Sequence, residues 1–264
     1  MNSKLFRLLS LLPHNPGEFT ERAFAMAEVR WQGRGFRPPY YQALDIDHAL
    51  LSLQEWLGED LPARLEESPL ACIEKQVKRE ANQLPREAPF GTFHNGDLLF
   101  GRVCYATARA LRANLVVETG VCYGVASACL LQALDVNQAG ALHSIDLPPL
   151  GKDADAFVGW LIPQALRSRW TLHRGTSRRL LRSLAEGLGS IDLFVHDSLH
   201  TYRNMRMEFE TVWPVLRPGG ALISDDIEGN AAFQELASRP DVAHAVVLQQ
   251  RDKNALLGVA IKRI

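Results

Sequence analysis

The stretch VVETGVCYGVAS, residues 116–127, joins a β-branched apolar run to a glycine turn and the start of a helical pattern. In a parallel α/β sheet, such a turn lets the backbone approach a ligand at the carboxyl end of the first strand. A dinucleotide fingerprint would read G-x-G-x-x-G, whereas only Gly120 and Gly124 are present here. The stretch therefore predicts a βαβ unit that binds a cofactor other than a typical dinucleotide.

Two carboxylates indicate which cofactor this turn would serve. Glu118 stands where the phosphates of a dinucleotide would arrive, so it would repel a pyrophosphate but attract the ammonium and sulfonium groups of S-adenosylmethionine. Asp146 ends the second expected strand and could accept hydrogen bonds from the ribose hydroxyls of either cofactor. The alternatives are an ion pair for Glu118 and turn roles for Gly120 and Asp146. We expect S-adenosylmethionine and keep a nicotinamide cofactor as the alternative.

Around this unit, short β-branched runs alternate with helical periods from Ala88 onward, as a parallel sheet requires. A helix is expected over 202–216, ended by RPGG, and the chain closes with an antiparallel hairpin over 242–262. The expected strands before the hairpin are 114–119, 141–146, 170–175, 191–197 and 220–226. This pattern predicts an α/β, Rossmann-like fold.

The first 87 residues have a different pattern. Helical periods, such as the apolar positions within 46–57, are separated by the proline-rich joints GRGFRPPYY and NQLPREAPF. We therefore expect a helical N-terminal cap over 1–87, followed by the cofactor domain over 88–264.

The composition of the chain indicates which classes of binding partner to expect. With 29 Lys and Arg against 30 Asp and Glu, the chain has a formal net charge of −1 and no electrostatic footprint for nucleic acid or an anionic membrane. Its four cysteines lack CxxC spacing, which favours reduced thiols and a cytoplasmic location. The apolar N-terminal run is short and interrupted by Arg7, so we expect an amphipathic helix there and no membrane span. A small-molecule partner is expected.

A second polar group follows two of the expected strands. In FVHDSLHTYRNM, residues 194–205, Asp197 ends one strand, and Asp225 and Asp226 end the next. Neighbouring strands lie about 4.8 Å apart, so these carboxylates would crowd and favour a hard divalent cation, most simply Mg²⁺. Such an ion could orient a substrate hydroxyl and lower its pKa, and His200 could accept the proton.

Other roles for these residues stay open. Asp197 or Ser198 could cap the helix that follows, and Asp225 or Asp226 could cap the helix after the next strand. A zinc site in HDSLH lacks a third soft ligand nearby, and a hydrolase site lacks a G-x-S-x-G elbow around Ser198.

Over residues 91–262, the chain resembles the class I S-adenosylmethionine-dependent methyltransferases. VVETGVCYGVAS is similar to their first motif, HSIDL to their second-strand acidic motif, and LRPGGALISDDI to their fifth strand and the turn before it. The run from Ile191 to Ile227 resembles the small-molecule O-methyltransferase branch that includes the catechol and macrocin enzymes. The resemblance implies a seven-stranded, mostly parallel sheet with an antiparallel last strand.

The resemblance also implies roles for individual residues. His200 stands where the catechol enzyme has its lysine base, which leaves the identity of the base and the acceptor chemistry open. Asp226 stands where that enzyme has asparagine, which adds charge at the implied metal position. HNGD, 94–97, resembles weakly the segment that closes over the cofactor. The implied cofactor residues are Glu118, Gly120 and Gly124 for the methionine part and glycine turn, Asp146 for the ribose, and Thr176 or Ser177 for the adenine edge; the implied metal ligands are Asp197, Asp225 and Asp226.

These observations together predict a metal-assisted O-methyltransferase that acts on a small hydroxylated molecule, such as a sugar or phenol of a secondary metabolite. Asp197 and His200 are its expected catalytic residues, and a homodimer is one assembly that the N-terminal helices could support. The alternatives are a nicotinamide-dependent oxidoreductase and a non-catalytic module that binds S-adenosylmethionine.

Overall fold

A seven-stranded sheet with the order β3-β2-β1-β4-β5-β7-β6 forms the centre of the protein. The computed structural model describes residues 6, 8–32, 39–90, 98–151, 153–250, 253 and 255–264. Strand β7 runs antiparallel to β5 and β6, and the other pairs are parallel. The strands are β1 (Leu115–Thr119), β2 (Ala141–Asp146), β3 (Trp170–Arg174), β4 (Ile191–His196), β5 (Leu216–Ser224), β6 (Val242–Gln250) and β7 (Ala255–Lys262). The predicted Rossmann-like sheet with an antiparallel last strand is confirmed.

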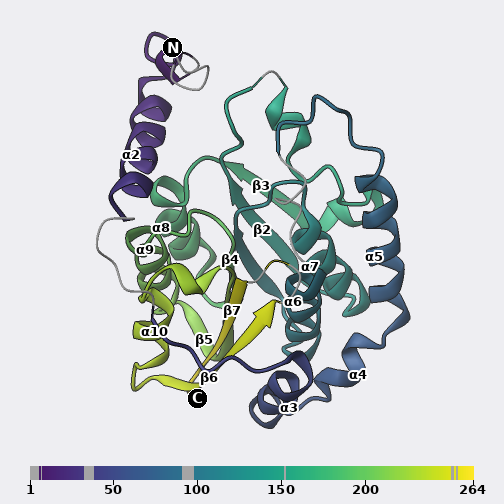
Figure 1. The fold of residues 1–264 in the computed structure, drawn as a ribbon. Helices are drawn as coiled ribbons and strands as arrows, with labels where there is room; N and C mark the ends of the chain where they lie inside the picture. The colour runs from purple at the N-terminus through teal and green to yellow at the C-terminus, as the bar shows by residue number, and fades with distance from the viewer. Residues whose placement is uncertain are drawn as a thin grey trace.

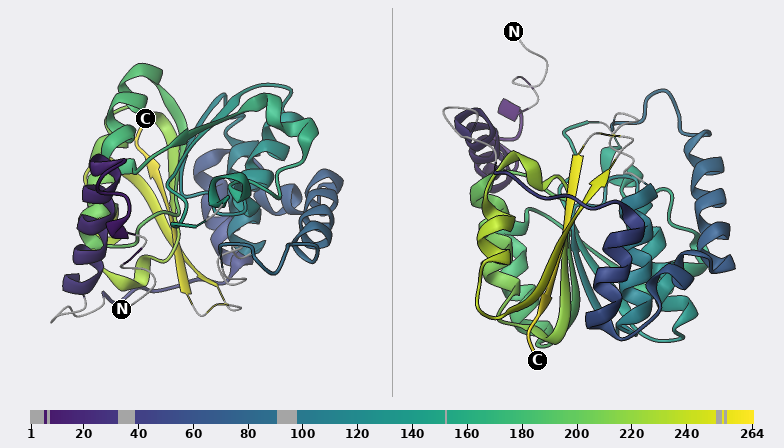
Figure 2. Two further views of the ribbon diagram at one scale, coloured as in Figure 1. Left: turned by 90° about the horizontal axis from the view of Figure 1, so that it is seen from above. Right: turned by 60° about the horizontal axis from the view of Figure 1, so that its bottom comes forward.

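Helices cover both faces of the sheet, as the edge-on view in Figure 2 shows. One face carries α3 (Ile46–Leu57), α4 (Leu61–Leu65), α5 (Ser68–Ala81), α6 (Leu98–Ala110) and α7 (Val125–Val136). The other face carries α8 (Ser177–Leu188), α9 (Tyr202–Val212) and α10 (Ala232–Ala237). Alternate residues of β1 serve the two layers, since Val116 packs in the first core and Val117 in the second. This alternation explains why the strands read as continuous apolar runs.

The helix expected over 202–216 is shorter than predicted. It ends at Val212, and β5 begins at Leu216, so RPGG lies within the strand and does not form the turn before it. The helix stops because Pro214 has no N–H with which to continue the hydrogen-bond ladder. Leu216 pairs with Ile191, and a register shift then brings Ala221 opposite Leu193. β5 ends at Ser224, and Asp225 follows it directly, as predicted.

The N-terminal residues occupy two separate places. Helix α2 (Pro16–Gln32) lies beside α8 and α9 at the carboxyl ends of the parallel strands (Figure 1). Its Glu18 forms an ion pair with Arg174 at 2.9 Å, and the Gln32 side chain accepts a hydrogen bond from Tyr202 N at 2.6 Å. Helices α3 to α5 instead share the core of α6 and α7. Among the described N-terminal helices, α2 alone therefore lies at the sheet edge that a cap over the cofactor would cover. The domain boundary at residue 87 stays a prediction.

Residues 39–45, which precede α3, follow the outer edge of the sheet. Leu44 forms a parallel bridge with Leu248, donating to Val247 O at 2.8 Å and accepting from Gln249 N at 3.1 Å. Figure 2, right, shows this dark blue segment crossing beside the yellow strands. Because β6 is the last strand of the sheet, the segment satisfies main-chain groups that would otherwise be open.

Candidate active site at the carboxyl ends of the parallel strands

The glycine turn after β1 packs directly against the end of β4. Gly120 has φ 86°, and a Cβ placed on it would lie 1.9 Å from the carbonyl oxygen of Asp197. The main chain ties the two segments together, since Asp197 N donates to Thr119 O at 2.8 Å. Only glycine fits this position, and the fit brings the predicted cofactor turn into contact with Asp197. Gly124, at φ 88°, begins α7.

Asp146 supports this turn from the end of β2. One of its carboxylate oxygens accepts hydrogen bonds from Val121 N at 2.6 Å and Cys122 N at 2.9 Å. Burial raises the pKa of Asp146, and the two backbone donors oppose that shift. Asp146 therefore lies at the same edge as Gly120, with one oxygen holding the turn; its contact with ribose hydroxyls stays a prediction.

Glu118 lies deeper than the sequence suggested. Its side chain is 0% exposed, and its Oε2 accepts hydrogen bonds from Ser127 and Ser144, both at 2.7 Å. Its Oε1 is buried and has no hydrogen-bond partner among the described residues. Burial raises the pKa of Glu118 to about 7. Sequence reasoning expected this carboxylate to face the cofactor, and its contact with the methionine part stays a prediction.

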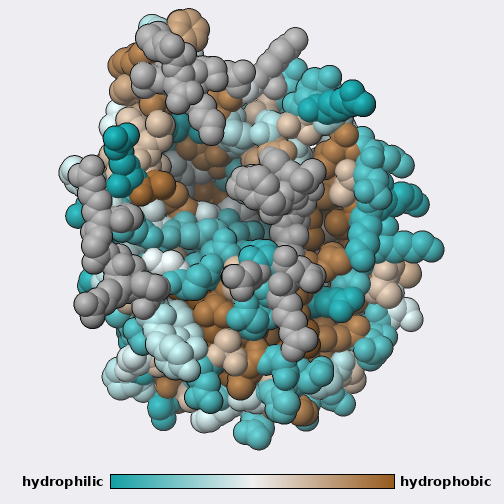
Figure 3. All heavy atoms as spheres, viewed as in Figure 1, coloured by the Kyte–Doolittle hydropathy of each residue, from teal (hydrophilic) through white to brown (hydrophobic). Residues whose placement is uncertain are grey.

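The two residues expected at the adenine edge begin α8 and meet other elements. Thr176 Oγ1 donates to Glu21 of α2 at 2.9 Å, whereas Ser177 is buried and its Oγ donates to Asn204 Oδ1 at 3.4 Å. Thr176 thus lies under α2, at the edge predicted for the cofactor. Figure 3 shows that this face of the molecule is hollowed, with hydrophobic side chains in the recess and hydrophilic ones along the outer surface of α5.

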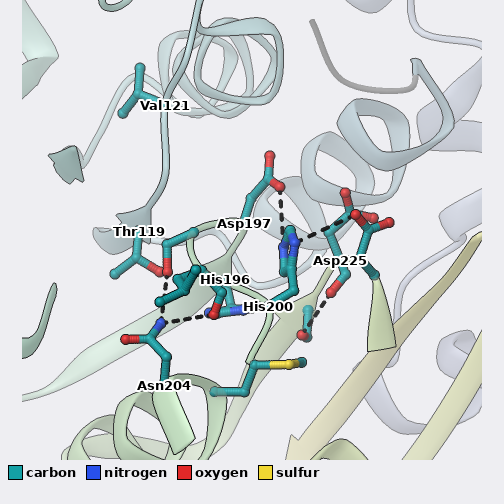
Figure 4. Close-up of polar contacts among 12 residues, drawn as sticks. Thr119, Val121, His196, Asp197, His200, Asn204 and Asp225 are labelled. Carbon is teal, nitrogen blue, oxygen red and sulfur yellow. Dashed lines mark hydrogen bonds and ion pairs between the residues drawn. The ribbon is translucent and has the colours of Figure 1, made fainter. Parts of the chain in front are cut away.

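The predicted acidic residues gather around one imidazole. His200 Nε2 lies 3.6 Å from Asp197 Oδ1, and His200 Nδ1 lies 3.5 Å from Asp226 Oδ2. Figure 4 shows the ring between Asp197 on one side and the tip of β5, which carries Asp225, on the other. Burial lowers the pKa of His200 to about 4, so the ring is neutral near pH 7 and can accept a proton.

A lysine that the sequence analysis did not single out completes this group. Lys253 Nζ lies 2.5 Å from Asp225 Oδ2 and 2.9 Å from Asp226 Oδ1. The other oxygen of Asp225 accepts from Gln250 Nε2 at 2.5 Å. Lys253 belongs to the turn between β6 and β7, and β6 runs parallel to β5, so this turn reaches the same sheet edge. That topology was the signal in the sequence, from which only the hairpin over 242–262 was predicted.

The three aspartates, as folded, do not fit a divalent ion. Lys253 bridges Asp225 and Asp226, and His200 stands between Asp226 and Asp197. In the part of the chain that the structure describes, no group of three or more His, Cys, Asp or Glu side chains could hold a metal ion. Magnesium therefore remains a prediction that this arrangement does not support.

A second buried network lies directly behind the site, and the sequence analysis missed it. Glu208 of α9 is 0% exposed and accepts hydrogen bonds from Thr119 Oγ1 at 2.6 Å, Ser198 Oγ at 2.7 Å and Asn204 Nδ2 at 3.0 Å. It also contacts His196 Nδ1 at 2.6 Å. Figure 4 shows Thr119, His196 and Asn204 close together at the end of β4. This network fixes the end of β4, from which Asp197 and His200 follow.

The capping alternative is wrong for α9, and Asp226 stands at the N-cap position of the short 3-10 helix Ile227–Gly229 without capping it through its side chain. Thr201, not Asp197 or Ser198, is the N-cap of α9, and its side chain accepts from Asn204 N. Ahead of α10, Asn230 Oδ1 accepts from Ala232 N, and Asp226 makes no side-chain cap hydrogen bond.

Comparisons with known proteins identify the domain. The family model described as "Methyltransferase domain" matches residues 117–227, which run from β1 through the glycine turn to the aspartates after β5. Residues 117–227 therefore carry the methyltransferase domain that this family model describes. The recognition made from the sequence motifs is confirmed, and the nicotinamide alternative falls away.

Solved structures share the fold of this methyltransferase at low sequence identity. The O-methyltransferase TomG from Streptomyces achromogenes, involved in tomaymycin synthesis and solved with S-adenosylmethionine, has a TM-score of 0.55 at 18% identity, with 75% of this chain and 91% of that chain covered. An O-methyltransferase from Bacillus cereus, in complex with S-adenosylhomocysteine, has a TM-score of 0.53 at 17% identity over 75% and 91%. The Podospora anserina methyltransferase PaMTH1 has a TM-score of 0.56 at 14% sequence identity, with 75% of this chain and 89% of that chain covered.

No curated protein matches the sequence of this methyltransferase. Among its described residues, no helix is long and apolar enough to cross a membrane.

Proposed function

We propose that this methyltransferase transfers the methyl group of S-adenosylmethionine to a hydroxyl oxygen of a small molecule, with His200 as the base. The proposal rests on one arrangement: a neutral imidazole, flanked by Asp197 and Asp226, lies beside the Gly120 turn at the carboxyl edge of the sheet. The shared fold with proteins named O-methyltransferases supports the choice of oxygen as acceptor.

The residues at this edge fit the cofactor. The glycine turn at the end of β1 brings the backbone close to a ligand, Asp146 stands at the end of β2, and the buried Oε1 of Glu118 lacks a protein partner among the described residues. When bound, S-adenosylmethionine supplies an electrophilic methyl group on a sulfonium. Gly120, Asp146, Thr176 and Glu118 are the residues proposed to hold it.

His200 would accept the proton of the acceptor hydroxyl. Its Nε2 is buried and has no hydrogen-bond partner among the described residues, so the ring keeps an unused bonding position. The nearby carboxylates of Asp197 and Asp226 stabilise the imidazolium that forms. A sugar or phenol as acceptor, and a homodimer as the assembly, remain predictions.

His200→Gln tests this proposal. Removing a general base lowers the rate by about 10²–10⁴-fold, while the affinity for S-adenosylhomocysteine, measured by calorimetry, should stay within a factor of about three of wild type. The rate is followed as S-adenosylhomocysteine release with a panel of phenols and sugars. His14→Gln, at an exposed position outside the site, is the matched control. If His200→Gln methylated at the wild-type rate, His200 would not be the base. If wild type failed to bind S-adenosylhomocysteine, the proposed cofactor would be wrong.

A further inference from the structure

The ammonium of Lys253 occupies the place between the β5 carboxylates where a metal would have to bind. Its side chain is 29% exposed and contacts both Asp225 and Asp226. Asp225 is only 3% exposed, and its second oxygen is held by Gln250. A divalent ion at Asp225 would have to displace Lys253 and compete with Gln250.

The charges of the group agree with this placement. Burying the β5 carboxylates side by side is unfavourable unless a cation lies between them, and Lys253 is the described cation within contact distance of both. An ammonium carries three N–H donors. Two reach the aspartates, which leaves one for an oxygen atom of a ligand.

We propose that Lys253 is the resident cation of the acceptor site, binding the acceptor hydroxyl oxygen in the role that a metal ion would otherwise fill. This proposal rests on the proposed O-methylation. In that reaction, His200 takes the hydroxyl proton and the oxygen lone pair forms a bond to the methyl carbon. The C–S bond breaks with its electron pair going to sulfur, which leaves a neutral thioether and a methyl ether. Lys253 stays protonated throughout, and His200 later releases its proton to water.

This role differs from the general one of neutralising buried carboxylates. An ammonium that contacts the acceptor oxygen stabilises the negative charge that develops there, and loss of one such donor costs about 10²–10³-fold in rate. It also makes a metal unnecessary, so the wild-type protein should neither bind a divalent ion at this site nor depend on one.

Three variants test the proposal: Lys253→Met, which removes the charge, Lys253→Arg, which keeps it, and Lys78→Met, which removes an exposed lysine of α5 as a control. Each is purified, its metal content is measured, and thermal unfolding is followed with S-adenosylhomocysteine present, with and without millimolar magnesium or manganese chloride. Methylation rates are measured with and without EDTA.

Wild type and Lys78→Met should carry no stoichiometric metal, unfold at a temperature that the metals do not change, and keep their rate in EDTA. Lys253→Met should be stabilised by added metal, because its carboxylates lose their cation and an ion that binds only the folded state raises the unfolding temperature. Its metal-free rate should fall about 10²–10³-fold, and Lys253→Arg should retain more of that rate.

Wild type that contains a stoichiometric metal, or that loses its activity in EDTA, would overturn the proposal. A Lys253→Met variant that gains no metal response and keeps its rate would also overturn it. These results would leave O-methylation standing, provided that calorimetry still detects S-adenosylhomocysteine binding. Absence of that binding in wild type would refute the proposed function itself.

Discussion

Replacing Glu208 with glutamine tests whether the buried network behind the site holds the end of β4. The Glu208 carboxylate accepts three hydrogen bonds and contacts His196 Nδ1 at 2.6 Å. Glutamine has almost the same shape, but it carries no charge and presents an NH₂ group to these donors. The substitution therefore removes the charge-assisted hydrogen bonds without leaving a cavity.

The size of the effect follows from the pKa of Glu208. Burial alone would raise this pKa, but His196 and the surrounding donors lower it from 4.5 to about 2. At about 1.4 kcal/mol per pKa unit, the carboxylate stabilises the folded protein by about 3 kcal/mol. Since the pKa is lower in the folded state, this stabilisation is complete above about pH 4.5 and is lost as the pH falls toward 2.

The assay is urea denaturation followed by tryptophan fluorescence. Near neutral pH, Glu208→Gln should lose about 3 kcal/mol of unfolding free energy, and the difference from wild type should shrink in acid below the unfolded pKa. Glu210→Gln, on the same helix but with a side chain 56% exposed, is the control and should change stability by less than about 1 kcal/mol. If Glu208→Gln were as stable as this control, or if its deficit persisted undiminished in acid, the network would not have the role argued here.

Two further substitutions have clear expected outcomes. Gly120→Ala should weaken S-adenosylhomocysteine binding by more than about 100-fold in calorimetry, because the added Cβ would lie 1.9 Å from Asp197 O. The control is Gly187→Ala, whose added Cβ would meet nothing within 4 Å, and this variant should bind as wild type does. Glu28→Gln should weaken the packing of α2, because Glu28 is 6% exposed and accepts a hydrogen bond from Thr201. Faster amide hydrogen exchange in α2, with unchanged exchange in α5, would confirm this prediction. Unchanged exchange in α2 would contradict it.

Much of the fold could be predicted because local patterns and burial agree. The run 191–197 reads as a strand since β4 is covered by helices on both faces, and the glycine turn after Thr119 could only be a close backbone approach. The end of the helix at Val212 and the early start of β5 were missed, because RPGG has the composition of a turn but lies within β5, between the residues that pair with Ile191 and Leu193 of β4.

The site could be predicted only as far as strand order reveals it. Asp197 and Asp225 follow adjacent parallel strands, so their proximity could be expected from the sequence. Lys253 belongs to a turn whose position depends on where a distant hairpin joins the sheet, and Glu208 depends on which face of α9 turns inward. Such contacts come from tertiary packing, which one sequence does not encode locally.

The main-chain pairing of Leu44 with β6 links the start of the chain to its end. An unprotected terminal strand is where another protein molecule can add its own backbone and begin aggregation. A shortened form that begins after this segment would keep the central strands and both helical layers, yet it would expose a ready template for intermolecular pairing. Solubility would then limit how far the amino terminus of this methyltransferase can be trimmed.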